Sequence, residues 1–252
     1  MNLPILINTR PQHRGDAIRQ MADMQVLDLP LLEIISLSIT QDEQEMMKSW
    51  LAGDYAALVI TSVEAARRAV AWLDKQAAHW QTTHQSPIIA VGAATAKVLT
   101  ARGLSVILPQ TANNEGMLAL PQIDALTAGD RLLIWRGVGG RRLLHDTLVA
   151  RGVQIDAVCW YERRVPKDLP QAFAQLQLND NKQPIYVIIS SQMAFESWCS
   201  LPQLNCVHYL ALGERLSGLI KAAKPASAVS QIDTLNPDDI RRAIGHALTV
   251  IH

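Results

Sequence analysis

The chain has 252 residues, of which 49% are hydrophobic, and its 23 basic and 23 acidic residues leave no formal net charge. This length can bury the core of one large domain or of two small ones, and the hydrophobic content excludes a disordered chain. The balanced charge argues against nonspecific binding to nucleic acid or to a membrane surface.

Predicted strands and helices alternate along the first half of the chain. Apolar runs bounded by turn residues predict strands at 4–8, 55–60 and 106–109, and another that leads into Gly92. Polar or amphipathic segments predict helices at about 13–24 and 42–51, from near Glu64, between Gly92 and Gly103, and from Asn113. The extended run 26–38 is interrupted by Pro30 and is long enough to leave one sheet and enter a connection.

The stretch 129–166 combines a strand–loop–helix–strand pattern with a local excess of positive charge. A strand at 132–135, a glycine-rich turn, a helix at 143–148 and a strand at 153–160 are typical of a right-handed parallel crossover. Seven arginines between 131 and 164 face only three acidic residues. We therefore expect an anion-binding function in this stretch.

The second half of the chain repeats the plan of the first. Residues 184–198 mirror the strand and helix that begin at Tyr55, and 208–225 mirror 87–103 with Gly213 in the place of Gly92. The repeat distance is about 120 to 130 residues, which is much longer than that of a solenoid. The pattern predicts two similar three-layer α/β lobes with mainly parallel sheets, flavodoxin-like or Rossmann-like in type.

The duplication also predicts how the chain is divided. Lobe one should comprise 1–36 and 166–252, and lobe two should comprise 40–160. Two extended segments, 35–40 and 161–166, should join the lobes as hinge strands. A cleft between lobes is a common place for a ligand.

Small hydroxyl and glycine residues follow several predicted strands, where parallel α/β sheets bind ligands. The turns concerned are Thr9-Arg10, Thr61-Ser62, Gly92 to Thr95, Arg136 to Gly140 (which includes Gly137), and Ser190-Ser191. Each offers backbone N–H groups and the positive end of a helix dipole, which suit a carboxylate or a phosphate. The alternative is that they are ordinary helix caps and tight turns, but the match between Thr61-Ser62 and Ser190-Ser191 favours a functional site.

Two features of the central stretch stay open on spacing alone. Arg136, Arg141 and Arg142 are either a fork for carboxylates or a solvated helix N-terminus, and the turn lacks the full glycine spacing of a dinucleotide site. Tyr161 ends a strand at the expected hinge beside two arginines. It is either a donor of a proton or hydrogen bond to a leaving oxygen or a residue that packs the hinge.

The sequence favours neither a metal site nor a secreted or membrane protein. Its seven histidines are scattered, and Cys159, Cys199 and Cys206 lack ligand spacing and are expected to be reduced, mostly buried thiols. The first apolar run, 3–7, is too short for a signal peptide, and no segment approaches the roughly 18 apolar residues of a membrane span. We expect a soluble, cytoplasmic and monomeric protein.

Motifs along nearly the whole chain resemble the uroporphyrinogen-III synthase family. In order they are TRP (9–11), ITSVEAARRAV (60–70), AVGAATAKVLTARG (90–103), EGMLAL (115–120), the 136–152 stretch followed by WYERRVP (160–166), IISSQMAF (188–195) and ALGERLSGLIKAAKP (211–225). The resemblance implies two α/β lobes and a cyclising lyase that uses no cofactor or metal. Its expected substrate is the linear tetrapyrrole hydroxymethylbilane. Loss of the ring-A hydroxyl would give an azafulvene, and attack at ring D through a spiro intermediate would close the macrocycle with ring D inverted.

The resemblance also carries over residue by residue. Tyr161 matches the family tyrosine thought to assist loss of the hydroxyl, and Thr61, Ser62, Thr95, Arg141 and Ser190 match cleft positions associated with substrate binding. With the turns above, the expected substrate contacts are Arg10, Thr61, Ser62, Gly92, Thr95, Arg136, Gly137, Gly140, Arg141, Ser190, Ser191 and Gly213. The chain departs from the family pattern at Leu216, where many relatives have threonine, and at Glu214, where proline is more usual. The alternative function is a non-catalytic two-lobed module that binds a small polyanion.

Overall fold

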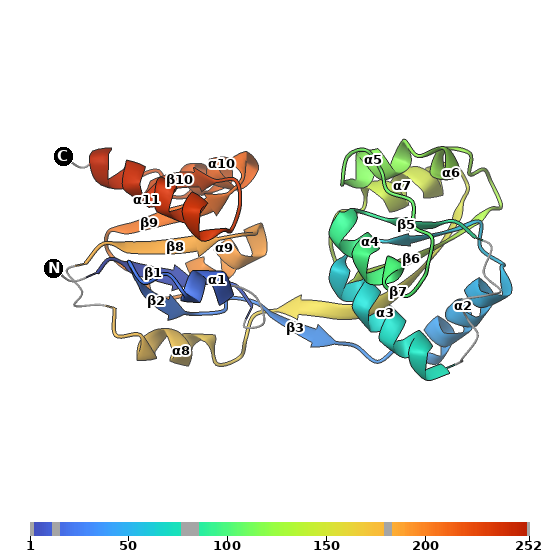
Figure 1. Ribbon diagram of the computed structural model, residues 1–252, viewed down its shortest axis with the longest axis horizontal. Helices are drawn as coiled ribbons and strands as arrows, with labels where there is room; N and C mark the ends of the chain where they lie inside the picture. The colour runs from blue at the N-terminus through green and yellow to red at the C-terminus, as the bar shows by residue number, and fades with distance from the viewer. Residues whose placement is uncertain (1–2, 12–15, 77–85, 179–182, 251–252) are drawn as a thin grey trace. The chain divides into compact units, whose positions relative to one another are not determined.

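The computed structural model describes residues 3–11, 16–76, 86–178 and 183–250, and it divides into two compact units. Unit 1 comprises 1–34 and 164–252, and unit 2 comprises 35–163. Both units contain a five-stranded sheet with helices (Figure 1). The predicted α/β class with mainly parallel sheets is confirmed.

Unit 1 is built on the sheet β10-β9-β8-β1-β2, in which every neighbouring pair is parallel. Numbered in order of appearance within the unit, these strands follow the flavodoxin-like order 2-1-3-4-5, whose switch point lies between β1 and β8. The strands are β1 (Ile5–Asn8), β2 (Gln25–Asp28), β8 (Ile185–Ile189), β9 (Val207–Leu212) and β10 (Ala228–Ile232).

Helices cover both faces of this sheet because alternate strand residues point to opposite sides. Ile5, Ile7 and Val187 pack with residues of α8 (Leu169–Gln175), α9 (Gln192–Cys199) and α10 (Glu214–Ala223). Leu6 and Ile188 pack with residues of α1 (Asp16–Arg19) and α11 (Pro237–Val250). The predicted helix 13–24 lies partly outside the described residues, and the helix that is described ends at Arg19, earlier than predicted.

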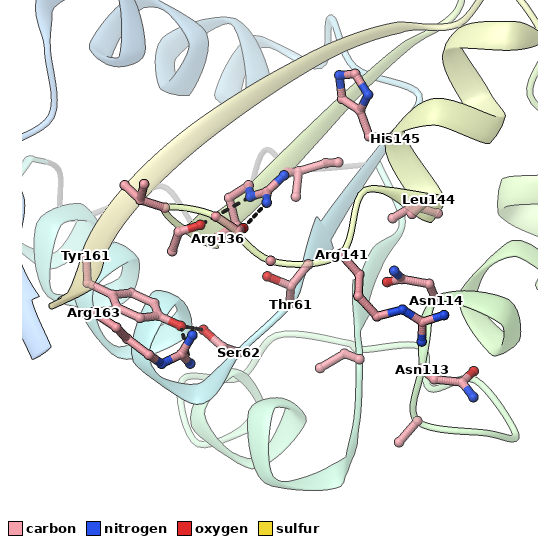
Figure 2. A pocket seen from close by; sticks show the side chains of 17 residues that line it. Thr61, Ser62, Asn113, Asn114, Arg136, Arg141, Leu144, His145, Tyr161 and Arg163 are labelled. Carbon is pink, nitrogen blue, oxygen red and sulfur yellow. Dashed lines mark hydrogen bonds between the residues drawn. The ribbon is translucent and has the colours of Figure 1, made fainter. Parts of the chain in front are cut away.

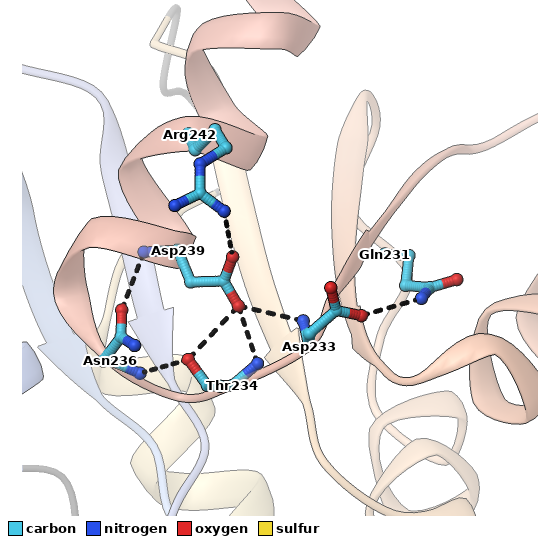
Figure 3. Close-up of polar contacts among 6 residues, drawn as sticks. All are labelled: Gln231, Asp233, Thr234, Asn236, Asp239 and Arg242. Atoms are coloured by element: carbon cyan, nitrogen blue, oxygen red, sulfur yellow. Dashed lines mark hydrogen bonds and ion pairs between the residues drawn. The ribbon is translucent and has the colours of Figure 1, made fainter.

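The start of α11 is fixed by a polar cluster (Figure 3). The Oδ1 atom of Asn236 accepts from the backbone N–H of Asp239 at 2.8 Å. The Oδ2 atom of Asp239 accepts from the backbone N–H groups of Asp233 and Thr234 at 2.9 and 2.6 Å, while Arg242 pairs with its Oδ1 atom at 2.9 Å. These bonds to the ionised form lower the pKa of Asp239, led by the N–H of Thr234.

Unit 2 is built on the sheet β3-β7-β6-β4-β5, and its pairs β4–β5, β4–β6 and β6–β7 are parallel. The strands are β3 (Glu33–Ser36), β4 (Ala57–Ile60), β5 (Ile88–Ala90), β6 (Arg131–Gly137) and β7 (Gln154–Arg164). Without β3, and with β4 to β7 numbered 1 to 4, the order β5-β4-β6-β7 reads 2-1-3-4. The switch point of this sheet therefore lies between β4 and β6. The predicted strand at 106–109 is wrong, since only Ile107 makes a bridge, to Ile89, before Pro109 ends the pairing.

Two sets of helices sandwich this second sheet. On one face, Val59, Leu132 and Ile134 pack with residues of α5 (Asn114–Leu118), α6 (Pro121–Asp124) and α7 (Leu143–Ala150). The opposite face carries α2 (Gln41–Ala52), α3 (Val63–Gln76) and α4 (Ala93–Thr100). There the rings of Trp50 in α2 and Trp135 in β6 pack in a T-shaped arrangement with their centroids 5.1 Å apart. The extended run 26–38 is divided by Pro30 into β2 and β3, which belong to different sheets.

Candidate active site

A cavity of about 360 Å³ lies in unit 2 at the carboxyl ends of β4, β6 and β7 (Figure 2). Because β4 and β6 flank the switch point, this is the place where an open α/β sheet is expected to bind a ligand. Three arginines and no acidic residue are among its lining side chains. The lining residues are Thr61, Ser62, Val91, Ala112, Asn113, Asn114, Ile134, Arg136, Gly137, Val138, Gly139, Gly140, Arg141, Leu144, His145, Tyr161 and Arg163.

The turn after β4 places two hydroxyls at the cavity. The N–H of Thr61 continues the sheet pairing by donating to the carbonyl of Trp135 at 3.0 Å, and its Oγ1 donates to the same carbonyl at 3.3 Å. The Oγ atom of Ser62 accepts from the N–H of Ala65 at 3.1 Å, which caps the first turn of α3. The capping role and the exposure to the cavity are therefore combined in one residue.

The glycine-rich turn after β6 folds one arginine back on itself. Gly139 and Gly140 adopt φ angles of 77° and 91°, which non-glycine residues rarely take. The Arg136 guanidinium donates to the carbonyl of Gly137 at 3.2 Å and to that of Gly139. Arg136 therefore braces the loop with two of the five N–H donors of its guanidinium.

Arg141 and Arg142 behave differently from one another. Arg141 lines the cavity and forms a two-pronged contact with Glu115 of α5, whose shorter distance is 2.7 Å. Arg142 is not among the lining residues and pairs instead with Asp146 at 3.1 Å. Of the three arginines that the sequence leaves as either a carboxylate fork or a solvated helix N-terminus, Arg136 and Arg141 line the cavity and Arg142 does not.

Tyr161 is enclosed by its neighbours and is only 2% exposed. A side chain at Gly137 would place its Cβ 2.5 Å from the ring, so that position has room for glycine alone. The guanidinium carbons of Arg68 and Arg163 lie 5.5 and 5.2 Å from the ring centroid, within cation–π range. The phenol accepts from Arg163 at 3.0 Å and donates to Ser62 at 3.1 Å.

The other predicted site residues lie away from this cavity. Gly92 and Thr95 belong to unit 2, but Gly92 caps α4 from outside the lining and Thr95 is 3% exposed. Four lie in unit 1 after the strands β1, β8 and β9, namely Arg10, Ser190, Ser191 and Gly213. There Ser191 caps α9 through a bond from the N–H of Ala194 at 3.2 Å, as Ser62 caps α3.

Several lining residues were not predicted as site residues. Asn113, Asn114, His145 and Arg163 all line the cavity. Arg163 stands two residues after Tyr161 on the same strand, and the two-residue repeat of a strand puts both on one side. This two-residue spacing could have identified Arg163 as a site residue from the sequence.

The comparisons identify the family. A family model described as uroporphyrinogen-III synthase HemD matches residues 16–229, which is most of the chain. The chain belongs to the uroporphyrinogen-III synthase family. This family acts on a tetrapyrrole substrate, and nothing in the comparisons favours the non-catalytic polyanion-binding module.

Members of the uroporphyrinogen-III synthase family resemble this chain in sequence and in fold. The Escherichia coli K12 enzyme is 32% identical over 140 residues, covering 52% of this chain and 56% of that enzyme. The Salmonella typhimurium LT2 enzyme is 29% identical over 230 residues, covering 87% and 91%. Crystal structures of a mutant enzyme from the thermophilic bacterium Thermus thermophilus and of the Helicobacter pylori 26695 enzyme share the fold. The Thermus thermophilus structure has a TM-score of 0.66 and 14% identity, and the match covers 96% of this chain and 99% of that one. The Helicobacter pylori structure has a TM-score of 0.60 and 15% identity, and the match covers 99% of this chain and 100% of that one.

Membrane spans, metal ligands and the three cysteines were also considered in the sequence. No helix among the described residues is long and apolar enough to cross a membrane, and they hold no cluster of three or more metal-ligating side chains. Cys159 and Cys199 are partly buried, and burial raises the pKa of both thiols. Cys206 is exposed, so the expectation of burial is wrong for this cysteine.

Proposed function

We propose that this chain converts hydroxymethylbilane into uroporphyrinogen III, with loss of water and inversion of ring D. The observation that carries the proposal is the cavity of unit 2, which joins arginines and hydroxyls to a buried, polarised tyrosine. Membership of the synthase family supports the same reaction. The chain is proposed to act as a cytoplasmic monomer, with its two units as separate domains.

The charge of the cavity suits the substrate. Hydroxymethylbilane carries eight carboxylates, and guanidinium groups bind carboxylates through paired, charge-assisted hydrogen bonds. No Asp or Glu is among the residues that line the cavity with Arg136, Arg141 and Arg163. Arg141 forms an ion pair with Glu115, which lies outside the lining. Arg10, Ser190, Ser191 and Gly213 of unit 1, with Gly92 and Thr95 of unit 2, are proposed as further contacts.

The reaction needs one proton at its start. Protonation of the ring-A hydroxyl lets it leave as water, and the adjacent pyrrole nitrogen supplies the electron pair that forms the protonated azafulvene. Tyr161 is the proposed source of this proton, since its O–H already points along a hydrogen bond and its oxygen accepts from Arg163. The azafulvene is then attacked by ring D, and collapse of the spiro intermediate inverts that ring.

The product isomer tests this proposal directly. Purified chain is mixed with enzymatically generated hydroxymethylbilane, and the porphyrins are separated after oxidation. The proposal predicts isomer III. Isomer I alone, which spontaneous closure gives, would refute it.

A tyrosine variant tests the assigned residue. Tyr161→Phe should lower kcat by about 100-fold with little change in KM, because the proton is used in the transition state and not in binding. Tyr55→Phe is the matched control, since Tyr55 is also buried and hydrogen-bonded, to Asp156 at 2.7 Å, but precedes β4 at the other end of the sheet. Equal activity of both variants would remove Tyr161 from the mechanism.

A further inference from the structure

The hydrogen bonds of Ser62 leave its own proton available. A serine hydroxyl has two acceptor lone pairs and a single hydrogen. The Oγ atom of Ser62 accepts from the N–H of Ala65 at 3.1 Å and from the O–H of Tyr161 at 3.1 Å. Both acceptor positions are therefore occupied, and the hydrogen of Ser62 is left to donate elsewhere. Ser62 lines the cavity, so a ligand there is within its reach.

The Tyr161 phenol donates one hydrogen bond and accepts another. A guanidinium has only donors, so the Tyr161 oxygen must act as the acceptor in the 3.0 Å contact with Arg163. The phenol then uses its own hydrogen toward Ser62 (Figure 2). The three groups form a directed chain from Arg163 through Tyr161 to Ser62.

Exposure favours Ser62 over Tyr161 as the group that meets the substrate. Tyr161 is 2% exposed, with its ring covered by Gly137 and by two guanidiniums, whereas Ser62 is only partly buried. A phenol so enclosed can send a proton out through a neighbour without direct contact with a bulky tetrapyrrole.

Thr61 shows that the adjacent hydroxyl does not have this property. Its hydrogen is used in the bond to the Trp135 carbonyl at 3.3 Å, so toward the cavity it presents only lone pairs. The two neighbouring hydroxyls thus differ in kind: Ser62 presents a donor and Thr61 presents an acceptor.

We propose that Ser62 delivers the proton to the leaving hydroxyl and receives the proton of Tyr161 in return. This inference rests on the proposed function and deepens it. The Ser62 hydrogen moves to the hydroxyl oxygen, the carbon–oxygen bond breaks, and water departs while the pyrrole nitrogen supplies the electron pair. Tyr161 is left as a phenolate that accepts from Arg163. The proton released when ring D regains aromaticity returns through Ser62 to the phenolate, so the catalyst is restored.

The test compares Ser62→Ala, Ser62→Thr and Tyr161→Phe, with the double variant Ser62→Ala/Tyr161→Phe, in single-turnover formation of isomer III. A relay predicts that Ser62→Ala loses about 100-fold, as Tyr161→Phe does, and that the double variant is no slower than either. Ser62→Thr keeps a hydroxyl and should restore most of the rate. A proton inventory in mixed H₂O and D₂O should be curved for the wild type and linear for Tyr161→Phe.

A cap control separates catalysis from folding. Ser62→Ala also removes a helix cap and should lower Tm by about 2–4 °C. Thr40→Ala removes the cap of α2 in the same unit, where the Oγ1 atom accepts from the N–H of Glu43 at 3.2 Å, and should lower Tm similarly at full activity. If Ser62→Ala keeps kcat within twofold of wild type, or if the two losses multiply, Ser62 is not the donor. Those outcomes still yield isomer III from the wild type, whereas failure of the proposed function yields isomer I only.

Discussion

The close approach of Gly137 to Tyr161 makes Gly137→Ala a sensitive test of how the phenol is positioned. An added Cβ would stand 2.5 Å from the Cζ atom and 2.7 and 2.9 Å from the two Cε atoms of the ring. To reach an ordinary contact of 3.4 Å, the ring must move by about 0.9 Å. Its other neighbours, the guanidiniums of Arg68 and Arg163, already lie against it.

This displacement has separate effects on stability and on activity. Overpacking of this kind costs about 1–3 kcal/mol, and each kcal/mol lowers Tm by about 2–4 °C in a chain of this size. A shift of about 0.9 Å also removes the phenol oxygen from hydrogen-bond range of Ser62, which now lies at 3.1 Å. A misplacement of that size costs about 100-fold in rate, so kcat should fall by that factor with KM nearly unchanged.

The assay is isomer III formation at saturating substrate, together with thermal unfolding. Gly129→Ala is the matched control, because Gly129 has a φ of 92° with nothing within 4 Å and precedes β6, away from the cavity. It should lose about 1 kcal/mol through backbone strain and keep wild-type kcat. A Gly137→Ala protein with wild-type Tm and kcat would refute the reasoning about the enclosed ring.

Three further predictions concern charged groups. Asp239→Asn should destabilise the protein by about 1–3 kcal/mol at pH 7. Because hydrogen bonds lower the folded-state pKa of Asp239, its contribution is present above the unfolded pKa of about 3.9 and is lost as pH falls through the folded pKa. The gap between variant and wild type in urea unfolding should therefore close at low pH, and a constant gap would contradict the cause given. Asp156→Asn replaces the carboxylate that accepts from Tyr55 and Arg131 by a neutral amide with a single acceptor oxygen. It should cost about 1–2 kcal/mol without changing KM, since these residues lie at the amino ends of the strands, and a raised KM in steady-state assays would contradict this. Glu115→Gln releases Arg141 for a substrate carboxylate and should lower KM by about threefold at low salt with kcat unchanged, whereas a higher KM would show that the pair holds Arg141 in its binding position.

Local sequence patterns predicted the fold class because the repeated strand–turn–helix plan specifies parallel sheets. They failed where pairing depends on distant residues. The run 106–109 has strand-like composition, yet among the described residues only Ile107 of this run pairs, with Ile89. Pro109 has no N–H with which to extend the ladder. The run 26–38 was rightly predicted as extended, but its division at Pro30 between two sheets follows from packing.

The site shows the same limit. The turns after β4 and β6 were predicted from their small residues, and the structure places both at one cavity. The pairing of Arg141 with Glu115 joins positions 26 residues apart, and the burial of Tyr161 depends on Gly137 of a neighbouring strand. Such partners are set by strand register, which a single sequence does not fix. The roles assigned to these residues stay predictions.

The most direct measurement is the isomer composition formed from hydroxymethylbilane by the wild type, Tyr161→Phe and Tyr55→Phe side by side. The account predicts mainly isomer III from the wild type and from Tyr55→Phe, and mainly spontaneous isomer I from Tyr161→Phe. Isomer I alone from the wild type, or isomer III from Tyr161→Phe at the wild-type rate, would contradict it.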